Sequence, residues 1–554
     1  MADWNLATVF ESVSDALPEK TALVQGTTHR SWRDFDDRAA RFASALGALG
    51  LEPDSKVALY LRNGNEFLEA MYGGLKARAV HVNVNYRYLD AELAYLLENA
   101  DAEVLVFHGS LAAPVDAVRD QLPRLRAVVQ VDDGSPILDG ALDYETLLAE
   151  HDPAPRQRRT GDELWFVYTG GTTGMPKGVM WRNEDIYGTL GENTYPLFGE
   201  TLPERSADAG AIAVRVDAMG RSPVHLPASP LMHGTGVMTS IQTLFLGGSV
   251  VTLEGRHFDA DELWSTVARE RVTQLAIVGD AFAKPMVRAL EEAEARGEPY
   301  DLSSLGLVIS SGVIWSAEVK AELQARQPMI LLDSLGSSEG VGFASSITTP
   351  GEEARTARFK VGPRTKVLDD EGRDVTPGSG EQGMLALGGH LPVGYYKDPS
   401  KTAATFRTLG GVRYSVPGDW ATVDEDGTIT LLGRGSVCIN SGGEKIYPEE
   451  VEEALKRDPA VADCVAVGVP DDRYGEAVTA VVAAEPGRTV DPDSLRETDG
   501  GLARFKRPRH IVVVDEIQRG PNGKADYAWA RRTADALEDP AAVIERRAPV
   551  FRGR

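Results

Sequence analysis

The chain has 554 residues, of which 42% are hydrophobic and 25% are charged, and its formal net charge is -25 at pH 7. This length predicts several domain-sized units rather than one core, and the ordinary hydrophobic content excludes disorder over the whole chain. The acidic balance argues against a nucleic-acid or anionic-membrane surface, because either would need clustered lysine and arginine.

The first third of the chain alternates between helix and strand patterns. Ser31 and Asp34 have the spacing of a capping pair, and the apolar residues of the helix predicted after them recur on one helical face. The next elements predicted are a strand at 57–61, a helix at 66–76, a strand at 80–84, a helix at 91–97 and a strand at 104–107. This alternation predicts a parallel sheet.

A phosphate-binding loop is predicted directly after a buried strand at 164–167, in the sequence YTGGTTGMPKGVMW. Glycines allow backbone N–H groups to approach an anion, while threonine hydroxyls and a lysine add donors and positive charge. The loop differs from the common P-loop, because Pro176 stands where that pattern has a glycine before the lysine. The candidate phosphate-binding residues are Thr169, Gly170, Gly171, Thr172, Thr173, Gly174 and Lys177.

The remainder of the chain predicts three further regions. Strands at 274–278, 307–310 and 329–332 indicate a second α/β layer, and the segment 191–222 has so little periodicity that it predicts a surface insert. Short strands and turns at 360–430 indicate a small β-rich subdomain. A helix from Pro448 that ends before Pro459, followed by strands at 464–469, 477–483 and 511–514, indicates an α+β unit.

Two of the predicted strands end in polar segments, SSGVI at 310–314 and DSLGSSE at 333–339. Glu339 is a candidate ligand for magnesium beside phosphates, although a single glutamate there is also compatible with a solvated surface charge. The residues 336–340 also fit the G-x-S-x-G nucleophile elbow, which makes a serine hydrolase acting through Ser338 the alternative class. That motif needs a helix after the serine, and 341–350 has no helical face.

Three single residues are further candidates, each with a structural alternative. His233 follows Pro230-Leu231-Met232 and can orient a carboxylate, or it can be a buried structural histidine. Asp419 can accept the hydroxyls of a ribose, or it can be an ordinary turn residue. Lys524 follows GPNG in a turn that is unusually specific for a surface lysine.

The order of these segments resembles the adenylate-forming superfamily, specifically its acyl-CoA ligases, over nearly the whole chain. YTGGTTGMPKG is similar to the phosphate loop of this family, PLMHG to its histidine or aromatic segment, and SSGVI to its adenine-binding strand end. LGSSE resembles the Tyr-Gly-x-Thr-Glu motif, PGDW the ribose aspartate, LGRG the hinge and PNGKAD the catalytic lysine loop. INSGGEKIYPEEVEEAL is similar to the segment that directs glycines toward CoA.

The resemblance implies a reaction in two steps, with ATP, Mg²⁺ and CoA. A carboxylate attacks the α-phosphate of ATP, which gives an acyl adenylate and releases pyrophosphate. After the small domain rotates, CoA thiolate displaces AMP. The implied catalytic residues are Lys524, His233 and Glu339, with Glu339 and Ser338 at the metal and Lys524 acting in the first step only. The other implied nucleotide contacts are Gly312, Val313, Ile314, Asp333, Ser334, Leu335, Gly336, Ser338, Asp419 and Arg434, and the CoA contacts are Ser441, Gly442 and Gly443.

The fold implied is α/β. A large N-terminal domain, 1–434, combines two α/β layered subdomains with the small β-rich subdomain, and a mobile α+β C-terminal domain occupies 435–554. Two residues depart from the family pattern, since Leu335 replaces the adenine-stacking tyrosine and Ser436 the usual hinge acid or lysine.

The segment VNVNYRY at 82–88 and the sequence GRGSVCINSGGEKIYP resemble fatty-acyl and steroid-acyl branches, so the expected substrate is a hydrophobic acid. The alternative is an adenylating enzyme with a carrier protein, an amine or another nucleophile as acceptor. A homodimer is one hypothesis for the assembly. Only two cysteines, no signal-peptide pattern and no apolar run of membrane-spanning length predict a cytoplasmic enzyme.

Overall fold

The predicted alternation at 57–107 forms parallel neighbouring strands within one larger sheet. The computed structural model describes residues 4–171, 174–313, 315–369, 371–434, 437–441, 444–471, 475–497, 502, 506–519 and 524–535. Within these residues the sheet has the strand order β19-β9-β8-β4-β3-β5-β6-β7. Its strands are β3 (Lys56–Tyr60), β4 (Val80–Asn83), β5 (Ala102–His108), β6 (Ala127–Val131), β7 (Leu142–Asp143), β8 (Leu164–Gly171), β9 (Gly174–Arg182) and β19 (Gly394–Tyr395).

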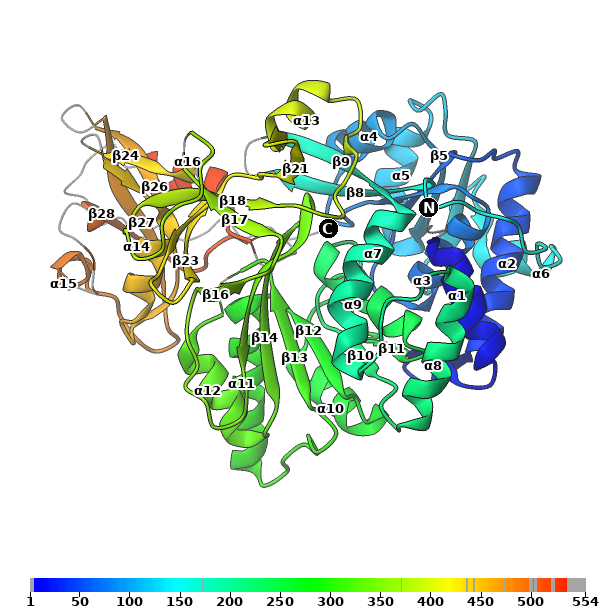
Figure 1. The fold of residues 1–554 in the computed structure, drawn as a ribbon, viewed down its shortest axis with the longest axis horizontal. Coiled ribbons are helices and arrows are strands. Elements are labelled where there is room, and N and C mark those ends of the chain that lie inside the picture. The colour runs from blue at the N-terminus through cyan, green and yellow to red at the C-terminus, as the bar shows by residue number, and fades with distance from the viewer. Residues whose placement is uncertain are drawn as a thin grey trace. The chain divides into compact units, whose positions relative to one another are not determined.

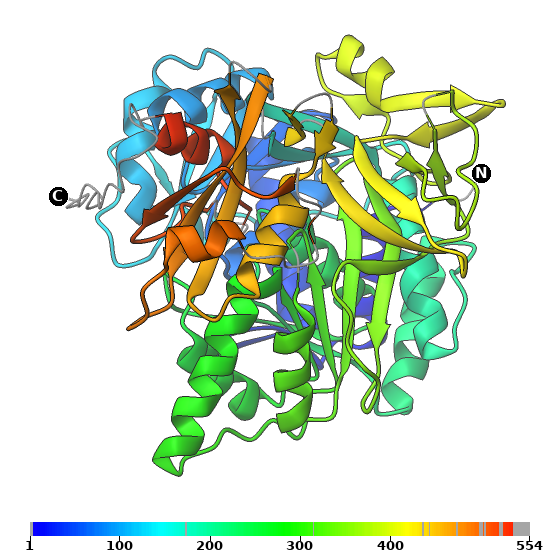
Figure 2. The same cartoon turned by 90° about the vertical axis from the view of Figure 1, so that its left-hand side faces the viewer.

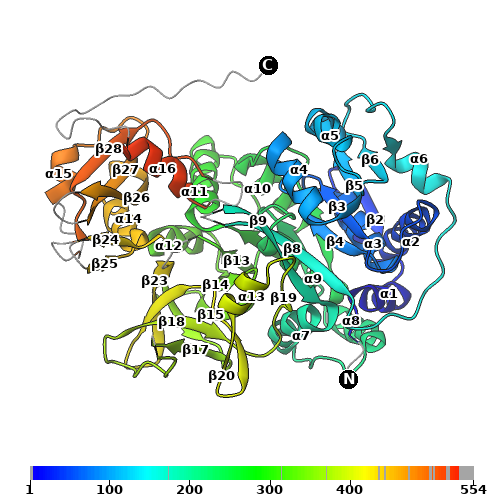
Figure 3. The ribbon, with the colours of Figure 1, turned by 90° about the horizontal axis from the view of Figure 1, so that it is seen from above.

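Alternate side chains of β3 pack against helices on opposite faces of this sheet, as the two-residue period of a strand requires. Val57 and Leu59 belong to the core beneath α2 (Trp32–Ala48) and α3 (Asn65–Lys76). Ala58 and Tyr60 belong to the core beneath α4 (Asp90–Asn99) and α5 (Ala112–Arg119). Figure 3 shows the two helix pairs on either side of the strands. Burial on both faces explains why these strands read as continuous apolar runs.

Helix α2 begins as predicted from its capping pair. Ser31 accepts a hydrogen bond from the backbone of Asp34, and the Asp34 carboxylate accepts one from the backbone of Ser31. The apolar face that follows is fully buried. Burial of each large apolar side chain contributes roughly 1.5–3 kcal/mol to stability. The buried members of this face include Phe35, Ala39, Phe42 and Leu46.

A second sheet in the same unit has the order β2-β1-β11-β10-β12-β13-β14-β15-β16. Its strands from β11 to β14 pair in parallel, and β15 returns antiparallel to β14. Figure 1 shows α11 and α12 beside β13 and β14. The strands are β1 (Thr21–Gln25), β2 (Thr28–Ser31), β10 (Val224–Pro227), β11 (Ser249–Thr252), β12 (Gln274–Ile277), β13 (Leu307–Ser311), β14 (Ile330–Ser337), β15 (Gly340–Thr348) and β16 (Arg358–Val361).

Other helices and one hairpin complete this first unit, which comprises Met1–Gly171, Met175–Thr365 and Leu387–Ser415. The helices are α1 (Leu6–Ala16), η1 (Gly109–Leu111), α6 (Tyr144–Ala149), α7 (Asn183–Thr194), η2 (Tyr195–Phe198), η3 (Ser206–Asp208), α8 (Ala209–Ala218), α9 (Gly234–Phe245), α10 (Ala260–Glu270), α11 (Gly279–Arg296), α12 (Ala317–Arg326) and α13 (Pro399–Thr405). The hairpin consists of β20 (Phe406–Leu409) and β21 (Val412–Ser415).

The prediction of an irregular surface insert at 191–222 is wrong for its central part. Helix α8 lies there, and Ala209, Ile212, Ala213 and Val216 are buried in the core shared with α1. These four residues recur at helical spacing, but three of them are alanine or valine and the apolar stripe is narrow. Their packing against α1 therefore determines the helix more than local propensity does.

The second unit comprises Thr172–Gly174, Lys366–Ala386 and Val416–Arg554. Its first part contains four strands of the predicted β-rich region, β17 (Thr365–Leu368), β18 (Gln382–Leu387), β22 (Asp419–Val423) and β23 (Thr428–Arg434), whereas Leu387–Ser415 of that region belong to the first unit. Its second part is a sheet of order β25-β24-β27-β26, with β28 pairing β27 in parallel. The strands are β24 (Ile439–Ser441), β25 (Glu444–Ile446), β26 (Val461–Asp471), β27 (Gly475–Ala484) and β28 (His510–Val514).

Three helices accompany this last sheet, namely α14 (Pro448–Lys456), α15 (Pro492–Glu497) and α16 (Tyr527–Asp535). Helix α14 begins at the predicted proline, buries Val451 and Leu455, and ends before Pro459. Figure 2 shows α16, in red, packed beside the orange strands of the sheet. The predicted α+β unit is confirmed.

Candidate active site

The predicted phosphate loop joins two strands of the first sheet. Thr169, Gly170 and Gly171 are the last residues of β8, and Gly174 is the first residue of β9. Thr172 and Thr173 lie outside the described residues. The chain therefore turns back into a strand, and a helix, α7, begins only after β9 ends. A P-loop instead leads directly into a helix, whose dipole helps to bind the phosphates. In this chain the strand β9 follows the loop directly, so a helix dipole does not contribute to the phosphate site in that way.

Lys177 lies on β9, eight residues beyond Thr169, and its ammonium group forms an ion pair with Asp398. The distance from Nζ to Oδ2 is 2.5 Å. The other oxygen of Asp398 accepts a hydrogen bond from the backbone of Lys401 at 2.8 Å, which caps the start of α13. The hydrogen bond from Lys177 is the main cause that lowers the pKa of the Asp398 carboxyl. A negative partner thus holds the phosphate-loop lysine in this structure.

The two polar strand ends predicted to bind a nucleotide lie side by side. Strands β13 and β14 pair in parallel, with Ser310 opposite Asp333 and Ser311 opposite Ser334. Gly312 follows with a φ of 94°, a conformation that favours glycine. The next residue, Val313, is partly buried against the core of the second sheet, while Ile314 lies outside the described residues.

Asp333 is a buried carboxylate at this strand end. Burial raises its pKa to about 6, although the Lys320 ammonium at 3.2 Å opposes the change. Both side chains are almost completely buried, and Lys320 also lies over the ring of Trp315. The side chain of Asp333 therefore has a structural partner in α12. Direct contact between this carboxylate and a nucleotide was predicted from sequence and stays a prediction.

The serine-hydrolase alternative is wrong in its geometry. Ser338 and Glu339 form the turn between β14 and β15, and Ser337 pairs with Gly340 across this tight hairpin. A nucleophile elbow requires a strand, a sharp turn and then a helix. Here the residues after the serine form a nine-residue strand, Gly340–Thr348. Leu335 and Gly336, also predicted to contact the nucleotide, lie on the last part of β14.

The same hairpin places the Glu339 carboxylate against the first sheet. Tyr395 donates a hydrogen bond from Oη to Oε1 of Glu339 at 2.7 Å, and Trp181 donates one from Nε1 to the backbone oxygen of Ser338 at 3.0 Å. Tyr395 uses only one of the two carboxylate oxygens. One carboxylate suits Mg²⁺ bound mainly by phosphates and water. The part of the chain that the structure describes contains no group of three or more His, Cys, Asp or Glu side chains able to hold a metal.

His233 is the N-cap residue of α9, in the turn after β10. Its neighbour Met232 is fixed by Asn83, whose Nδ2 donates to the Met232 backbone oxygen at 2.6 Å. Asn83 also exchanges two hydrogen bonds with the backbone of Tyr168, at 2.9 and 2.6 Å. One buried amide at the end of β4 thus connects the start of the phosphate loop to the histidine turn. The sequence analysis missed this role, although Asn83 lies in the VNVNYRY segment quoted for the resemblance.

In the second unit, Asp419 and Arg434 are directly opposite each other on β22 and β23. Both residues were predicted to contact the nucleotide, and they belong to separate motifs that lie 15 positions apart. Strand pairing brings their backbones together. Ser441, predicted to bind CoA, is buried at the end of β24, where it pairs with Glu444 of β25. Gly442 and Gly443 lie outside the described residues.

Lys524 is exposed at the end of a loop with a defined base. Arg519 and Ala525 form a bridge across that base, and the Asp526 amide donates to the Gln518 oxygen at 3.2 Å. The residues 520–523 lie outside the described part of the chain. Helix α16 begins three residues after the lysine. This base anchors both ends of the loop to the second unit.

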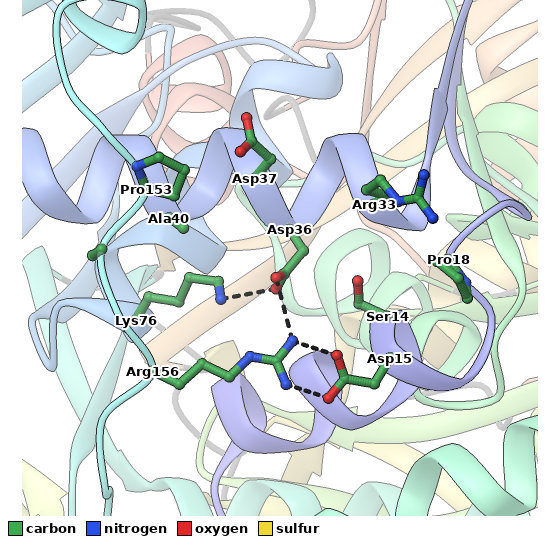
Figure 4. Close-up of a pocket in the computed structure, with 11 residues that line it drawn as sticks. Ser14, Asp15, Pro18, Arg33, Asp36, Asp37, Ala40, Lys76, Pro153 and Arg156 are labelled. Carbon is green, nitrogen blue, oxygen red and sulfur yellow. Dashed lines mark hydrogen bonds and ion pairs between the residues drawn. The ribbon is translucent and has the colours of Figure 1, made fainter.

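A further polar cavity of about 440 Å³ lies in the first unit, between α1, α2 and the segment around Pro153 (Figure 4). Its charged groups neutralise one another. Lys76 forms an ion pair with Asp36 at 2.8 Å, and Arg156 pairs with Asp15 and Asp36. These pairings link α1, α2 and α3, so we assign the cavity a structural role.

Comparison with known proteins decides the family. The model of the AMP-binding enzyme family matches residues 10–396, and the model of the AMP-binding enzyme C-terminal domain matches residues 450–524. The chain belongs to the AMP-binding enzymes. It is an acyl-CoA ligase of the adenylate-forming superfamily, with AMP-forming chemistry, as its motifs predicted.

Two relatives of the ligase match almost its whole length. It is 42% identical over 538 residues to the 3-oxocholest-4-en-26-oate–CoA ligase of Rhodococcus rhodochrous, which covers 95% of each chain. It is 43% identical over 541 residues to the medium/long-chain-fatty-acid–CoA/3-oxocholest-4-en-26-oate–CoA ligase of Mycobacterium tuberculosis, which covers 96% of each chain. A solved anthranilate CoA ligase in complex with anthranoyl-AMP shares the fold, with a TM-score of 0.81, 23% identity and coverage of 97% and 98%.

The predicted α/β fold with a large N-terminal and a small C-terminal part is confirmed by these structural neighbours. No helix among the described residues of the ligase is long and apolar enough to cross a bilayer. Besides Asn83, the sequence analysis missed Tyr395 and Asp398 as neighbours of the site. Both lie in the segment GYYKDP, 56 and 221 positions from the residues they contact.

Proposed function

We propose that the ligase converts a hydrophobic carboxylic acid, of the fatty or steroid-side-chain type, into its CoA thioester through an acyl adenylate. The observation that carries this proposal is the pair of full-length relatives, both of which bear the name of a steroid acid and one that of medium- and long-chain fatty acids. The match to the Rhodococcus relative extends over 95% of the chain.

The first half-reaction is assigned to residues of both units. Thr169 and Lys177 bind the β- and γ-phosphates, and Asp419 accepts the ribose hydroxyls. Lys524 donates to the acid carboxylate and to the ATP oxygens, where negative charge develops during attack on the α-phosphate. His233 orients the acid. Glu339, with Ser338 beside it, would hold Mg²⁺, which supplies positive charge to the triphosphate when bound.

The second half-reaction is assigned to the C-terminal part of the chain. Ser441, Gly442 and Gly443 direct the pantetheine arm of CoA to the acyl adenylate, whose carbonyl carbon is attacked by the thiolate, with AMP as leaving group. We place the domain division at Arg434 and propose that the part after it rotates between the two half-reactions. A cytoplasmic location and a homodimer also belong to this proposal, and sedimentation velocity of the purified chain tests the dimer.

Carboxylate-dependent exchange between ATP and labelled pyrophosphate tests the first half-reaction. The acids are a steroid bearing a side-chain carboxylate, medium- and long-chain fatty acids, and benzoate as a small aromatic control. Exchange with the hydrophobic acids but not with benzoate supports the proposal. Exchange with none of the fatty or steroid acids would refute the substrate class.

Mass spectrometry of the product tests the acceptor. The reaction contains one accepted acid, ATP, CoA and a competing amine, and it is compared with a reaction that lacks CoA. An acyl-CoA product with AMP release supports the proposed ligase. An amide or a free adenylate that CoA does not consume would show that the enzyme uses another acceptor.

A further inference from the structure

One short segment contacts both of the charged residues expected around the triphosphate. Tyr395 lies on β19, directly opposite Val179 on β9, and Val179 follows Lys177 by two residues. The Tyr395 hydroxyl donates to Oε1 of Glu339 at 2.7 Å, and Asp398, three residues further, pairs with Lys177 at 2.5 Å. The segment therefore connects the phosphate-loop strand to the β14–β15 turn within the first unit.

The Tyr395 side chain has little freedom to move. It is 5% exposed, and its ring packs against Phe406 with 6.0 Å between the ring centroids. Its backbone amide donates to the Thr402 hydroxyl at 2.9 Å, which ties β19 to α13. A hydroxyl on so constrained a ring holds its hydrogen-bond partner in one place. The partner here is the carboxylate expected to meet the metal.

A second contact restrains the same turn from the neighbouring strand. Trp181, on β9, is fully buried and donates from Nε1 to the Ser338 backbone oxygen at 3.0 Å. The backbone before Glu339 is thus fixed by one residue of the first sheet, and its side chain by another. Tyr395 donates to Oε1, which leaves lone pairs of the Glu339 carboxylate, including both of those on Oε2, open to a cation on the triphosphate.

We propose that Tyr395 is a positioning residue for metal–nucleotide binding, which sets the Glu339 carboxylate at a fixed place relative to the phosphate loop. The inference rests on the proposed role of Glu339 as the magnesium ligand. Tyr395 touches neither nucleotide nor metal and acts through Glu339. Because Tyr395 and Lys177 lie on paired strands of one sheet, the sheet fixes the backbone of the tyrosine that holds the carboxylate relative to the strand that carries the lysine.

The test measures Mn²⁺ binding by electron paramagnetic resonance in the presence of a non-hydrolysable ATP analogue. Mn²⁺ prefers the same oxygen ligands as Mg²⁺ and reports binding without turnover. Tyr395→Phe removes one oxygen and keeps the ring. Since a hydrogen bond to a charged group is lost, we expect Mn²⁺ affinity in this ternary complex to fall by about tenfold. In the exchange assay the magnesium concentration for half-maximal rate rises by a similar factor, and the rate at saturating magnesium falls less.

Tyr396→Phe is the matched control. This adjacent tyrosine donates to Asp101 at 2.7 Å on the opposite side of the strand segment, so its loss should leave Mn²⁺ affinity unchanged. Thermal unfolding of both variants measures any purely structural effect. If Tyr395→Phe lowers the unfolding temperature but binds Mn²⁺ like the wild type, the proposal is overturned.

Glu339→Gln separates this inference from the proposed function on which it rests. If Glu339→Gln binds Mn²⁺ as the wild type does, the metal role of Glu339 is wrong. If that variant binds weakly while Tyr395→Phe binds normally, Glu339 is a ligand and only the role of Tyr395 is wrong. If Tyr395 acts by positioning Glu339, adding Tyr395→Phe to the Glu339→Gln variant should lower Mn²⁺ affinity by less than about twofold, because both changes act on one interaction.

Discussion

Asp463 of β26 accepts two hydrogen bonds from the guanidinium group of Arg519, each 2.6 Å long. Burial raises the pKa of this aspartate, but Arg519 and Lys456 more than compensate, so the carboxyl titrates well below its ordinary range. Arg519 stands at the base of the Lys524 loop, opposite Ala525. A bidentate pair of this kind fixes direction as well as distance. The sheet of the second unit thus holds the proposed catalytic loop through one arginine.

Arg519→Ala should impair acyl-adenylate formation by about tenfold or more, because a misplaced catalytic group loses much of its rate advantage. Thioester formation from preformed adenylate should change far less, since Lys524 is assigned to the first step. Pyrophosphate exchange and single-turnover thioester assays measure the two steps. Lys456→Ala is the control, because this lysine contacts the same aspartate at 3.1 Å from α14, outside the loop. Equal loss of both steps in Arg519→Ala would contradict the loop assignment.

Lys524→Ala tests the catalytic lysine directly. Loss of a donor placed on developing charge should lower adenylation by about two orders of magnitude or more. Thioester formation from a preformed adenylate should remain largely intact. Lys506→Ala removes a lysine of the same unit that pairs with Glu450, and it should leave adenylation near the wild-type rate. If Lys524→Ala damages both half-reactions equally, alternation between two states of the C-terminal part is refuted.

Four strands of the first sheet, β3, β4, β5 and β8, could be predicted because each is an apolar run. The other four, β6, β7, β9 and β19, were not predicted. The positions of the phosphate loop, the β13 and β14 ends and the Lys524 loop also followed from local composition. Helix α8 could not be recognised in this way, because its stability depends on burial against α1. Propensity is a weak guide where tertiary packing decides.

The hydrogen bonds that organise the site could not be predicted from local sequence patterns, for a different reason. The bonds from Asn83 to Tyr168 and from Tyr395 to Glu339 join residues 85 and 56 positions apart. Nothing in the neighbourhood of an asparagine or tyrosine indicates which distant backbone or carboxylate it will meet. Sheet order brings these partners together, since β4 pairs with β8 and β9 pairs with β19.

Asn83→Ala should weaken both the fold and nucleotide binding. It removes the partners of the Tyr168 amide and of the Tyr168 and Met232 carbonyls, and each unsatisfied buried group costs about 1–3 kcal/mol. We expect a lower unfolding temperature and a KM for ATP raised by about tenfold, because the phosphate loop begins at Tyr168.

Asn99→Ala is the control for this change. Asn99 accepts a hydrogen bond from the Tyr168 hydroxyl at 2.7 Å, and among the residues that the structure describes it forms no hydrogen bond with the loop backbone. Thermal unfolding and exchange kinetics at varied ATP compare the two variants. A KM for ATP that rises equally in both would show that the Tyr168 side chain, rather than Asn83, supports the loop.

The pH dependence of stability should show the burial of Asp333. Its pKa is raised from an ordinary 3.8 to about 6, so the native state holds this proton more tightly than the unfolded chain. The resulting contribution to stability is fully present below about pH 4 and is lost as the pH rises through about 6. Asp333→Asn lacks this titration.

Denaturant unfolding of wild type and Asp333→Asn between about pH 4.5 and 7 checks the sign. The stability of the wild type relative to the variant should increase as the pH falls across this window. Lys320→Met removes a charge that lowers the Asp333 pKa. In that variant the gain in stability on acidification should therefore begin at higher pH. A wild type that instead loses stability relative to Asp333→Asn on acidification would mean that the Lys320 ion pair outweighs burial, with Asp333 ionised throughout. Its buried carboxylate would then add negative charge to a strand end proposed to face a nucleotide.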